Sequence, residues 1–80
     1  MIYILIEHVM NGTVTMNTIT TGVEAETFKD AIEKVKGMEG FRKFKPEINK
    51  ETDKEFEFQF PNQDLPVWGG MTDKPIKIIT

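Results

Sequence analysis

The sequence predicts an α+β domain in which an antiparallel sheet of about four strands is covered on one face by a single helix. Three observations support this prediction: one amphipathic helical segment, an Asn-Gly pair between two β-rich segments, and one strictly alternating strand pattern. A chain of 80 residues is the size of one small domain, spanning residues 1–80. The expected order of elements is β-β-α-β-β, and the pattern does not predict the order of strands in the sheet.

The helical period runs through residues 27–40. Its apolar residues recur at i, i+3, i+4, i+7 and i+10 and form one stripe, made of Phe28, Ala31, Ile32, Val35 and Met38. Thr27 is expected to cap the first turn, because a threonine hydroxyl can accept a hydrogen bond from a free backbone N–H. Gly37 and Gly40 both suit a left-handed residue at the C-terminal end. Strands must cover the apolar stripe.

Residues 2–10 and 13–21 are expected to form a hairpin around Asn11-Gly12, a pair typical of type I′ turns. This turn places Ile4 opposite Ile19 and Glu7 opposite Met16. One face of the hairpin then carries Ile2, Ile4, Ile6 and Ile19, and the other carries Tyr3, Leu5, Val9, Val14 and Met16. Because one helix covers only one face, the second must meet the C-terminal segment, another subunit or a partner.

The C-terminal half predicts two further strands. Residues 55–60 alternate strictly, with Phe56, Phe58 and Phe60 on one side and Glu55, Glu57 and Gln59 on the other. This pattern is typical of a half-buried strand with a solvated outer face. Residues 61–75 are expected to form a long irregular loop, and residues 76–79 a last short strand.

The inventory of reactive side chains argues against catalysis. The chain has no cysteine, no serine and one histidine, His8. It therefore lacks a Ser-His or Cys-His pair, and a zinc site is not expected because zinc usually takes several nitrogen or sulfur ligands. Glu55 and Glu57, about 7 Å apart on one strand face, are interpreted as solvated carboxylates. We expect no enzyme activity, no metal and no cofactor.

Charge and hydropathy limit the class of partner and the location. The net charge of −3 and the pI near 5.1 argue against a general nucleic-acid binder, which is usually basic. No apolar run reaches the length of a membrane span, and residues 1–10 lack a signal-peptide pattern. These observations predict a cytoplasmic protein that does not bind membranes.

Two stretches are candidate binding sites. In the first, Arg42, Lys43 and Lys45 surround Phe41 and Phe44. Basic residues between aromatic residues can follow a nucleic-acid backbone and stack on bases; alternatively, the two phenylalanines complete the core and leave the charges solvated.

The second stretch lies in the expected loop, where long irregular segments are often functional. Its candidate residues are Trp68, Gly69, Gly70, Met71 and Asp73. Trp68 is expected to anchor a partner protein, as tryptophans often do in interfaces, or to stack on the ring of a small molecule. The remaining alternative is that Trp68 plugs the open end of the core beside Leu65 and Val67.

The segment GVEAETFKDAIEKVKG, together with the hairpin before it, resembles a pattern found in small proteins of bacteriophages and other mobile elements. It also resembles the HicB-like antitoxin core, in which a hairpin leads to a similar helix. The Pro-Asp-Leu-Pro-Gly segment that precedes the helix in that core is missing here, and an Asp-Leu-Pro at residues 64–66 follows the helix instead. The resemblance implies a mobile-element origin and assigns no residue a role.

The leading hypothesis is a small, non-enzymatic, phage-type protein that binds a host protein stoichiometrically, as an inhibitor or modulator, for example of host defence. If the chain is phage-encoded, its location is the host cytoplasm. One alternative is an oligomer that binds a small anionic, nucleotide-like ligand, and a second, less favoured alternative is nucleic-acid binding. A chain of this size buries only about 60% of its unfolded surface, so a homodimer or higher oligomer is expected.

Overall fold

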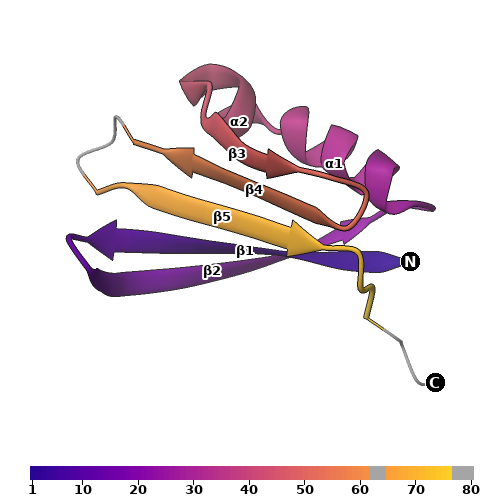
Figure 1. The fold of residues 1–80 in the computed structure, drawn as a ribbon, viewed down its shortest axis with the longest axis horizontal. Coiled ribbons are helices and arrows are strands. Elements are labelled where there is room, and N and C mark those ends of the chain that lie inside the picture. Colours follow the sequence, from indigo (N-terminus) through magenta and orange to yellow (C-terminus); the bar gives the residue numbers. More distant parts are fainter. Residues whose placement is uncertain (62–64, 77–80) are drawn as a thin grey trace.

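The computed structural model describes residues 1–61 and 65–76, and these contain five strands and two short helices. The strands are β1 (Ile2–Asn11), β2 (Val14–Glu24), β3 (Glu47–Glu51), β4 (Glu55–Phe60) and β5 (Val67–Thr72). The helices are α1 (Phe28–Lys36) and α2 (Glu39–Phe44). The strands form one antiparallel sheet in the order β2-β1-β5-β4-β3 (Figure 1). The predicted α+β class is confirmed, whereas the predicted four strands and single helix are wrong.

The helix expected over residues 27–40 is divided in two. The predicted cap is confirmed, because the Thr27 hydroxyl accepts a hydrogen bond from the Asp30 backbone N–H at 3.1 Å. Helix α1 ends at Gly37, whose φ of −84° is right-handed, and Gly40 lies inside α2. The predicted left-handed glycine caps are therefore wrong. The left-handed residue is Lys45, with φ +46°, at the end of α2.

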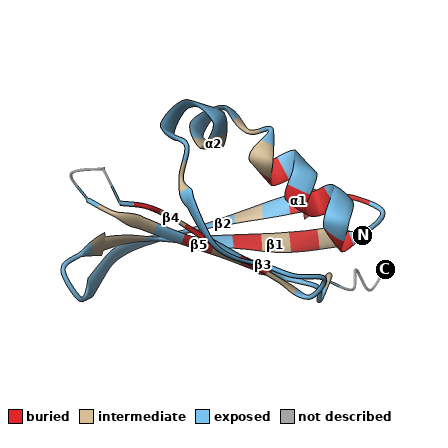
Figure 2. Ribbon diagram, turned by 45° about the horizontal axis from the view of Figure 1, so that its top comes forward, coloured by how far each residue is buried: buried red, intermediate tan, exposed pale blue. Residues whose placement is uncertain are grey.

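Both helices lie on one side of the sheet, and the buried residues lie between them and the strands (Figure 2). The predicted stripe of α1 is confirmed, since four of its members are buried and Met38 packs against them. The core consists of Tyr3, Leu5, Val23, Ala25, Phe28, Ala31, Ile32, Val35, Phe56, Phe58, Phe60 and Met71. The predicted alternation of β4 is confirmed by its buried phenylalanines.

The basic-aromatic run contributes one of its two phenylalanines to this core. The Phe41 ring packs edge-on against Phe58, with ring centroids 5.1 Å apart, and also lies against Phe56 and Phe60. Phe44 is 51% exposed and touches only the edge of the cluster, at 6.5 Å from the Phe60 ring. The expectation that both phenylalanines complete the core is thus met by Phe41 alone.

The predicted hairpin exists, but its turn and register differ from the prediction. Asn11 pairs with Val14, so the turn residues are Gly12 and Thr13, and Gly12 alone has a positive φ, of 63°. That combination fits a type II′ turn rather than the predicted type I′. Because the turn begins one residue later than predicted, each residue of β1 near the turn lies opposite a residue of β2 that is two positions further along the chain.

An irregularity between Val9 and Met10 leaves Met16 as an extra residue on β2. Beyond this irregularity, the pairing of β1 with β2 is shifted by one more position. The total shift is odd, so it moves the side chains of β2 to the opposite faces. Ile4 lies opposite Gly22, and Ile19 lies opposite Glu7 on the helix side. The predicted pairs Ile4–Ile19 and Glu7–Met16 are wrong.

Residues 61–75 are not the predicted irregular loop. They contain β5, which is the central strand and pairs with β1 and β4. Pro and Gly residues within this stretch suggested a loop, since both are unusual in inner strands. Ile76 makes one isolated bridge to Ile2; residues 77–79 of the predicted last strand, and residues 62–64 of the predicted loop, lie outside the described residues.

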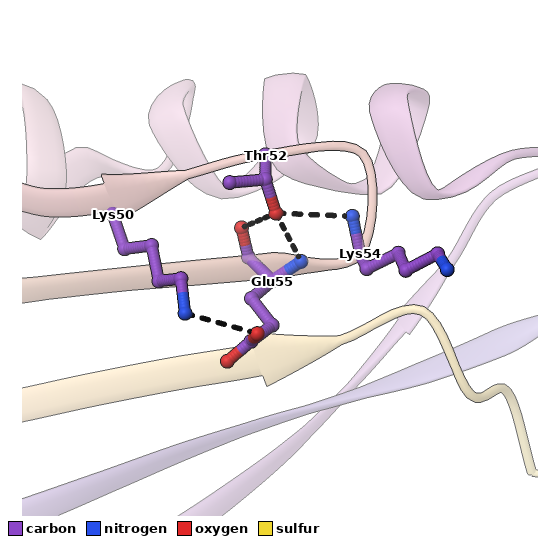
Figure 3. Close-up of polar contacts among 4 residues, drawn as sticks. All are labelled: Lys50, Thr52, Lys54 and Glu55. Atoms are coloured by element: carbon purple, nitrogen blue, oxygen red, sulfur yellow. Dashed lines mark hydrogen bonds and ion pairs between the residues drawn. The ribbon is translucent and has the colours of Figure 1, made fainter.

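The edge strand β3 was not predicted, because its sequence EINKE is mostly charged. Its pairing with β4 is organised by Thr52 (Figure 3). The Thr52 hydroxyl accepts hydrogen bonds from the backbone N–H of Lys54 at 3.2 Å and of Glu55 at 3.0 Å. The backbone N–H of Thr52 donates a hydrogen bond to the Glu55 carbonyl at 2.9 Å. These contacts close a tight turn that brings β3 back along β4.

Candidate functional site

The sheet surface opposite the helices, called the open face below, is covered by no element of the described residues. Cross-strand neighbours form rows over this face. The first row is Thr18, His8, Trp68, Gln59 and Glu47, and the second is Thr20, Ile6, Gly70, Glu57 and Lys50. A solvated sheet face is normally polar. The rows instead place apolar side chains on the two central strands and charged side chains on β4 and β3.

Trp68 is the largest apolar side chain of the open face. It is 54% exposed, and Ile6 in the next row is 40% exposed. Hollows lie on both sides of Trp68: one extends over Gly70 between Ile6 and Glu57, and the other lies beside Met10 and Thr15 near the hairpin turn. The first hollow exists because Gly70 has no side chain. Trp68 therefore forms a ridge between two depressions, and a binding partner can contact the indole from both sides.

The polar part of the open face is mostly acidic. Glu55 bonds to Lys50 at 3.0 Å, and this hydrogen bond raises the pKa of the Lys50 ammonium group. Glu47 accepts a hydrogen bond from the Gln59 amide at 2.9 Å. Among the described residues, Glu57 makes no ion pair. A carboxylate that makes no ion pair with any described residue thus borders the apolar hollow over Gly70, with Lys50 as its cross-strand neighbour.

Sequence reasoning missed one contact on this face. The His8 ring nitrogen Nδ1 and the Thr18 hydroxyl lie 3.0 Å apart, although ten residues separate them in the chain. A hydroxyl beside an imidazole is the geometry of a nucleophile and its base, but catalytic pairs also need a group that orients the base. In the part of the chain that the structure describes, the other His8 nitrogen has no hydrogen bond, and both side chains are exposed. The contact instead holds the imidazole beside Trp68.

The structure separates the residues of the predicted tryptophan site. Trp68 is exposed and does not plug the core, and Gly70 forms the floor of a hollow. Gly69 is buried under the Phe58 ring, and Met71 is 2% exposed within the core. Asp73 is exposed, but it lies about 16 Å along the strand direction from Trp68. Of the five residues of the predicted tryptophan site, only Trp68 and Gly70 lie at the surface in the centre of the open face.

The basic residues of the second predicted site lie on the other side of the sheet. Arg42 and Lys43 belong to α2, and Lys45 follows it. Helix α2 packs through Phe41 on the face that Phe58 shares, which is opposite the face of Trp68. Lys43 reaches over the Phe44 ring, with its Nζ 5.5 Å from the ring centroid. One small ligand therefore cannot contact both Trp68 and the basic residues.

A half-buried carboxylate on the helix side, that of Glu7, provides a test of the fold by pH. Burial raises the pKa of the Glu7 carboxyl above its ordinary value. The folded state therefore holds this proton more tightly than the unfolded state, and stability falls as the pH rises from the unfolded to the folded pKa. We expect Glu7→Gln to raise the free energy of unfolding at pH 7, with the gain shrinking as the pH falls through that interval.

Urea denaturation at pH 7 and near pH 4 measures this effect. Glu57→Gln is the matched control, because Glu57 is exposed on the open face of the same sheet. A gain that is equal for both variants, or independent of pH, would contradict the assignment to Glu7.

No described helix is long and apolar enough to span a bilayer. Within the same residues, no group of three or more His, Asp or Glu side chains is placed to hold a metal ion. Comparison with family models, with curated proteins and with solved structures returned no match to this chain. The resemblance to mobile-element proteins stays a prediction, and the function has to be inferred from the site.

Proposed function

We propose that this chain is a non-enzymatic protein-binding domain that captures a partner protein stoichiometrically through the open face. The supporting observation is the exposed Trp68 ridge beside Ile6 on a sheet surface that the described residues leave uncovered. Contiguous apolar groups on a small domain often mark interaction sites. With the resemblance to phage proteins, this proposal assigns the partner to the host cell and the effect to inhibition or modulation.

The open face suggests the chemistry of the partner. An apolar pocket would receive the Trp68 indole, because tryptophan contributes most to affinity when it is fully desolvated. An arginine or lysine beside that pocket would meet Glu57, the carboxylate without an ion pair among the described residues. The preferred partner is thus a protein surface with an apolar depression and a basic rim.

The alternatives predicted from the sequence have less support. A nucleotide-like ligand would use Arg42, Lys43 and the exposed Phe44, since Trp68 is on the opposite side. All three side chains lie on a helix of six residues, and Arg42 and Lys43 line a shallow surface with Glu39. Nucleic acid would have to bind the same small patch on a protein with net charge −3. A thermal shift with nucleotides would support the first alternative, and binding that weakens steeply with salt would support the second.

The test of the proposal is a comparison of Trp68→Ala with Phe44→Ala. Both residues are exposed aromatics, at 54% and 51%, but they lie on opposite sides of the sheet. Tagged wild type and both variants are used to capture proteins from a lysate of the source cell, and the enriched protein is purified for affinity measurement. We expect Trp68→Ala to raise its Kd at least about 30-fold, equivalent to about 2 kcal/mol. Phe44→Ala is expected to change Kd by less than about threefold.

A stoichiometric partner whose affinity is unchanged in Trp68→Ala would refute the use of the open face. Equal losses in both variants would also refute it, because they would report a general change in the domain. Circular dichroism of each variant serves as the control: affinities are compared only for variants that retain the fold.

A further inference from the structure

Strands β2 and β3 form the two edges of the sheet (Figure 1). These two edges differ in their protection against pairing with further strands. Native proteins shield edges with short strands, charges, prolines and irregular pairing. Strand β3 has these features: it has five residues, of which three are charged, it follows Pro46, and its pairing with β4 is irregular. Lys36 of α1 also pairs with Glu51 at 2.8 Å and crosses this edge from the helix side.

Strand β2 has almost none of these protections. It has 11 residues, and residues 14–23 contain neither a charge nor a proline. One irregularity occurs at Met16, near the hairpin turn, and the pairing with β1 is regular from Asn17 to Glu24. In an edge strand, every second residue points its N–H and C=O groups away from the neighbouring strand. No described strand pairs with this edge. The outward N–H of Thr18 donates to the Asn17 side chain at 2.9 Å, and the outward C=O of Glu24 accepts a hydrogen bond from the Lys34 ammonium group.

We propose that a second copy of this chain pairs with the outer edge of β2, antiparallel, over residues 17–23. Two identical strands paired in this way are related by a twofold axis, so each copy gives and receives the same contacts. The segment carries no charge, and self-pairing therefore brings no like charges together. Pairing over residues 17–23 is centred on Thr20, so the two copies of Thr20 lie opposite each other, and a Thr–Thr cross-strand pair is favourable.

The asymmetry of the edges predicts a closed dimer rather than a fibre. Each chain has one unprotected edge, and pairing β2 with β2 uses both. The dimer would contain one sheet of ten strands, with the two open faces joined. Ile19, which is 45% exposed on the helix side, would be covered by the added strand. This inference does not depend on the proposed function, since it concerns the strand edge and not the Trp68 ridge.

The test compares two isoleucines on the two edges. Ile19 on β2 and Ile48 on β3 are 45% and 44% exposed, and both share the helix-side face. Lysine protects strand edges, and a lysine at position 19 lies opposite Glu7, which can pair with its charge. We expect Ile19→Lys to convert the dimer to a monomer, whereas Ile48→Lys remains dimeric. Analytical ultracentrifugation of the full chain at about 100 μM detects a dimer of micromolar Kd.

Thr20→Lys is a second variant of the same edge and is expected to give the same monomer.

Hydrogen exchange by NMR distinguishes edge pairing from packing of the open faces. In the wild-type dimer, all N–H groups of residues 17–23 should exchange slowly, and in Ile19→Lys the outward N–H groups of Thr20 and Gly22 should exchange fast. A monomeric wild type, a dimer that survives both β2 substitutions, or a dimer that Trp68→Ala disrupts would overturn the proposal.

Discussion

Replacing Gly69 by alanine is expected to lower the free energy of unfolding by about 3 kcal/mol, because an added methyl group would overlap the core. A Cβ at Gly69 would lie 2.3 Å from Cζ of Phe58 and less than 3 Å from two other atoms of that ring. For a domain of this size, the loss corresponds to a decrease in Tm of roughly 15 °C. The effect is large because small domains are only marginally stable.

The Phe58 ring cannot move away to make room. It is 2% exposed and is enclosed by the rings of Phe41, Phe56 and Phe60, at centroid distances of 5.1, 5.4 and 5.6 Å. Moving the ring would break edge-on contacts that favour aromatic clusters. The strain must therefore be relieved by separating β5 from β4, which are the two strands that this pair connects.

Gly70→Ala is the control, since Gly70 is the adjacent residue on the opposite face of the same strand. A Cβ there would meet its nearest atoms at 3.7 and 3.9 Å, which is ordinary contact. We expect its Tm to stay within a few degrees of the wild type, while the added methyl group partly fills the hollow beside Trp68. Thermal melts of the three proteins give the answer, and equal stability of the two variants would show that Gly69 is not constrained by Phe58.

Met71→Ala is expected to destabilise the domain by about 3 kcal/mol, whereas Trp68→Ala should cost about 1 kcal/mol or less. Met71 is 2% exposed and pairs across from Phe56, so its truncation leaves a cavity in the core. Trp68 is 54% exposed on the other face, and truncating it leaves no buried void. Chemical denaturation with guanidinium chloride measures both values.

This pair of substitutions separates stability from binding within one strand. The expected result is a folded Trp68→Ala protein that has lost its partner, beside a Met71→Ala protein whose defects follow its lower stability. If Trp68→Ala proved the more destabilising of the two, the indole would have to contribute to the core and the open face would lose its anchor.

Local patterns in the sequence were sufficient for several elements. The helix stripe from Phe28 to Val35, the Thr27 cap and the alternation of Glu55–Phe60 depend on neighbours within one turn or one strand. The α+β class follows from these elements together, because a helix with one apolar face needs a sheet to cover it. The sequence pattern also offers an exposed Trp68 among the alternatives for this side chain, and the structure shows it exposed.

These local patterns did not predict the position and type of the turn in the first hairpin. Asn11-Gly12 indicated a hairpin correctly, but the turn positions and the extra residue at Met16 depend on how β1 and β2 fit the rest of the sheet. An odd error in register reverses the faces of β2, which is why Ile19 was assigned to the wrong side.

What only the tertiary structure decided is the place of residues 67–72. Glycines and prolines made this stretch resemble a loop, yet it is the central strand, because Gly69 lets the Phe58 ring lie directly on the backbone. Once the stretch is a strand, its side chains alternate between the faces, so Trp68 and Met71 point to opposite sides. The sequence by itself determined which local elements form, since their signals come from adjacent residues. The open face was decided by strand pairing between residues far apart in the chain, such as His8 with Trp68 and Ile6 with Gly70.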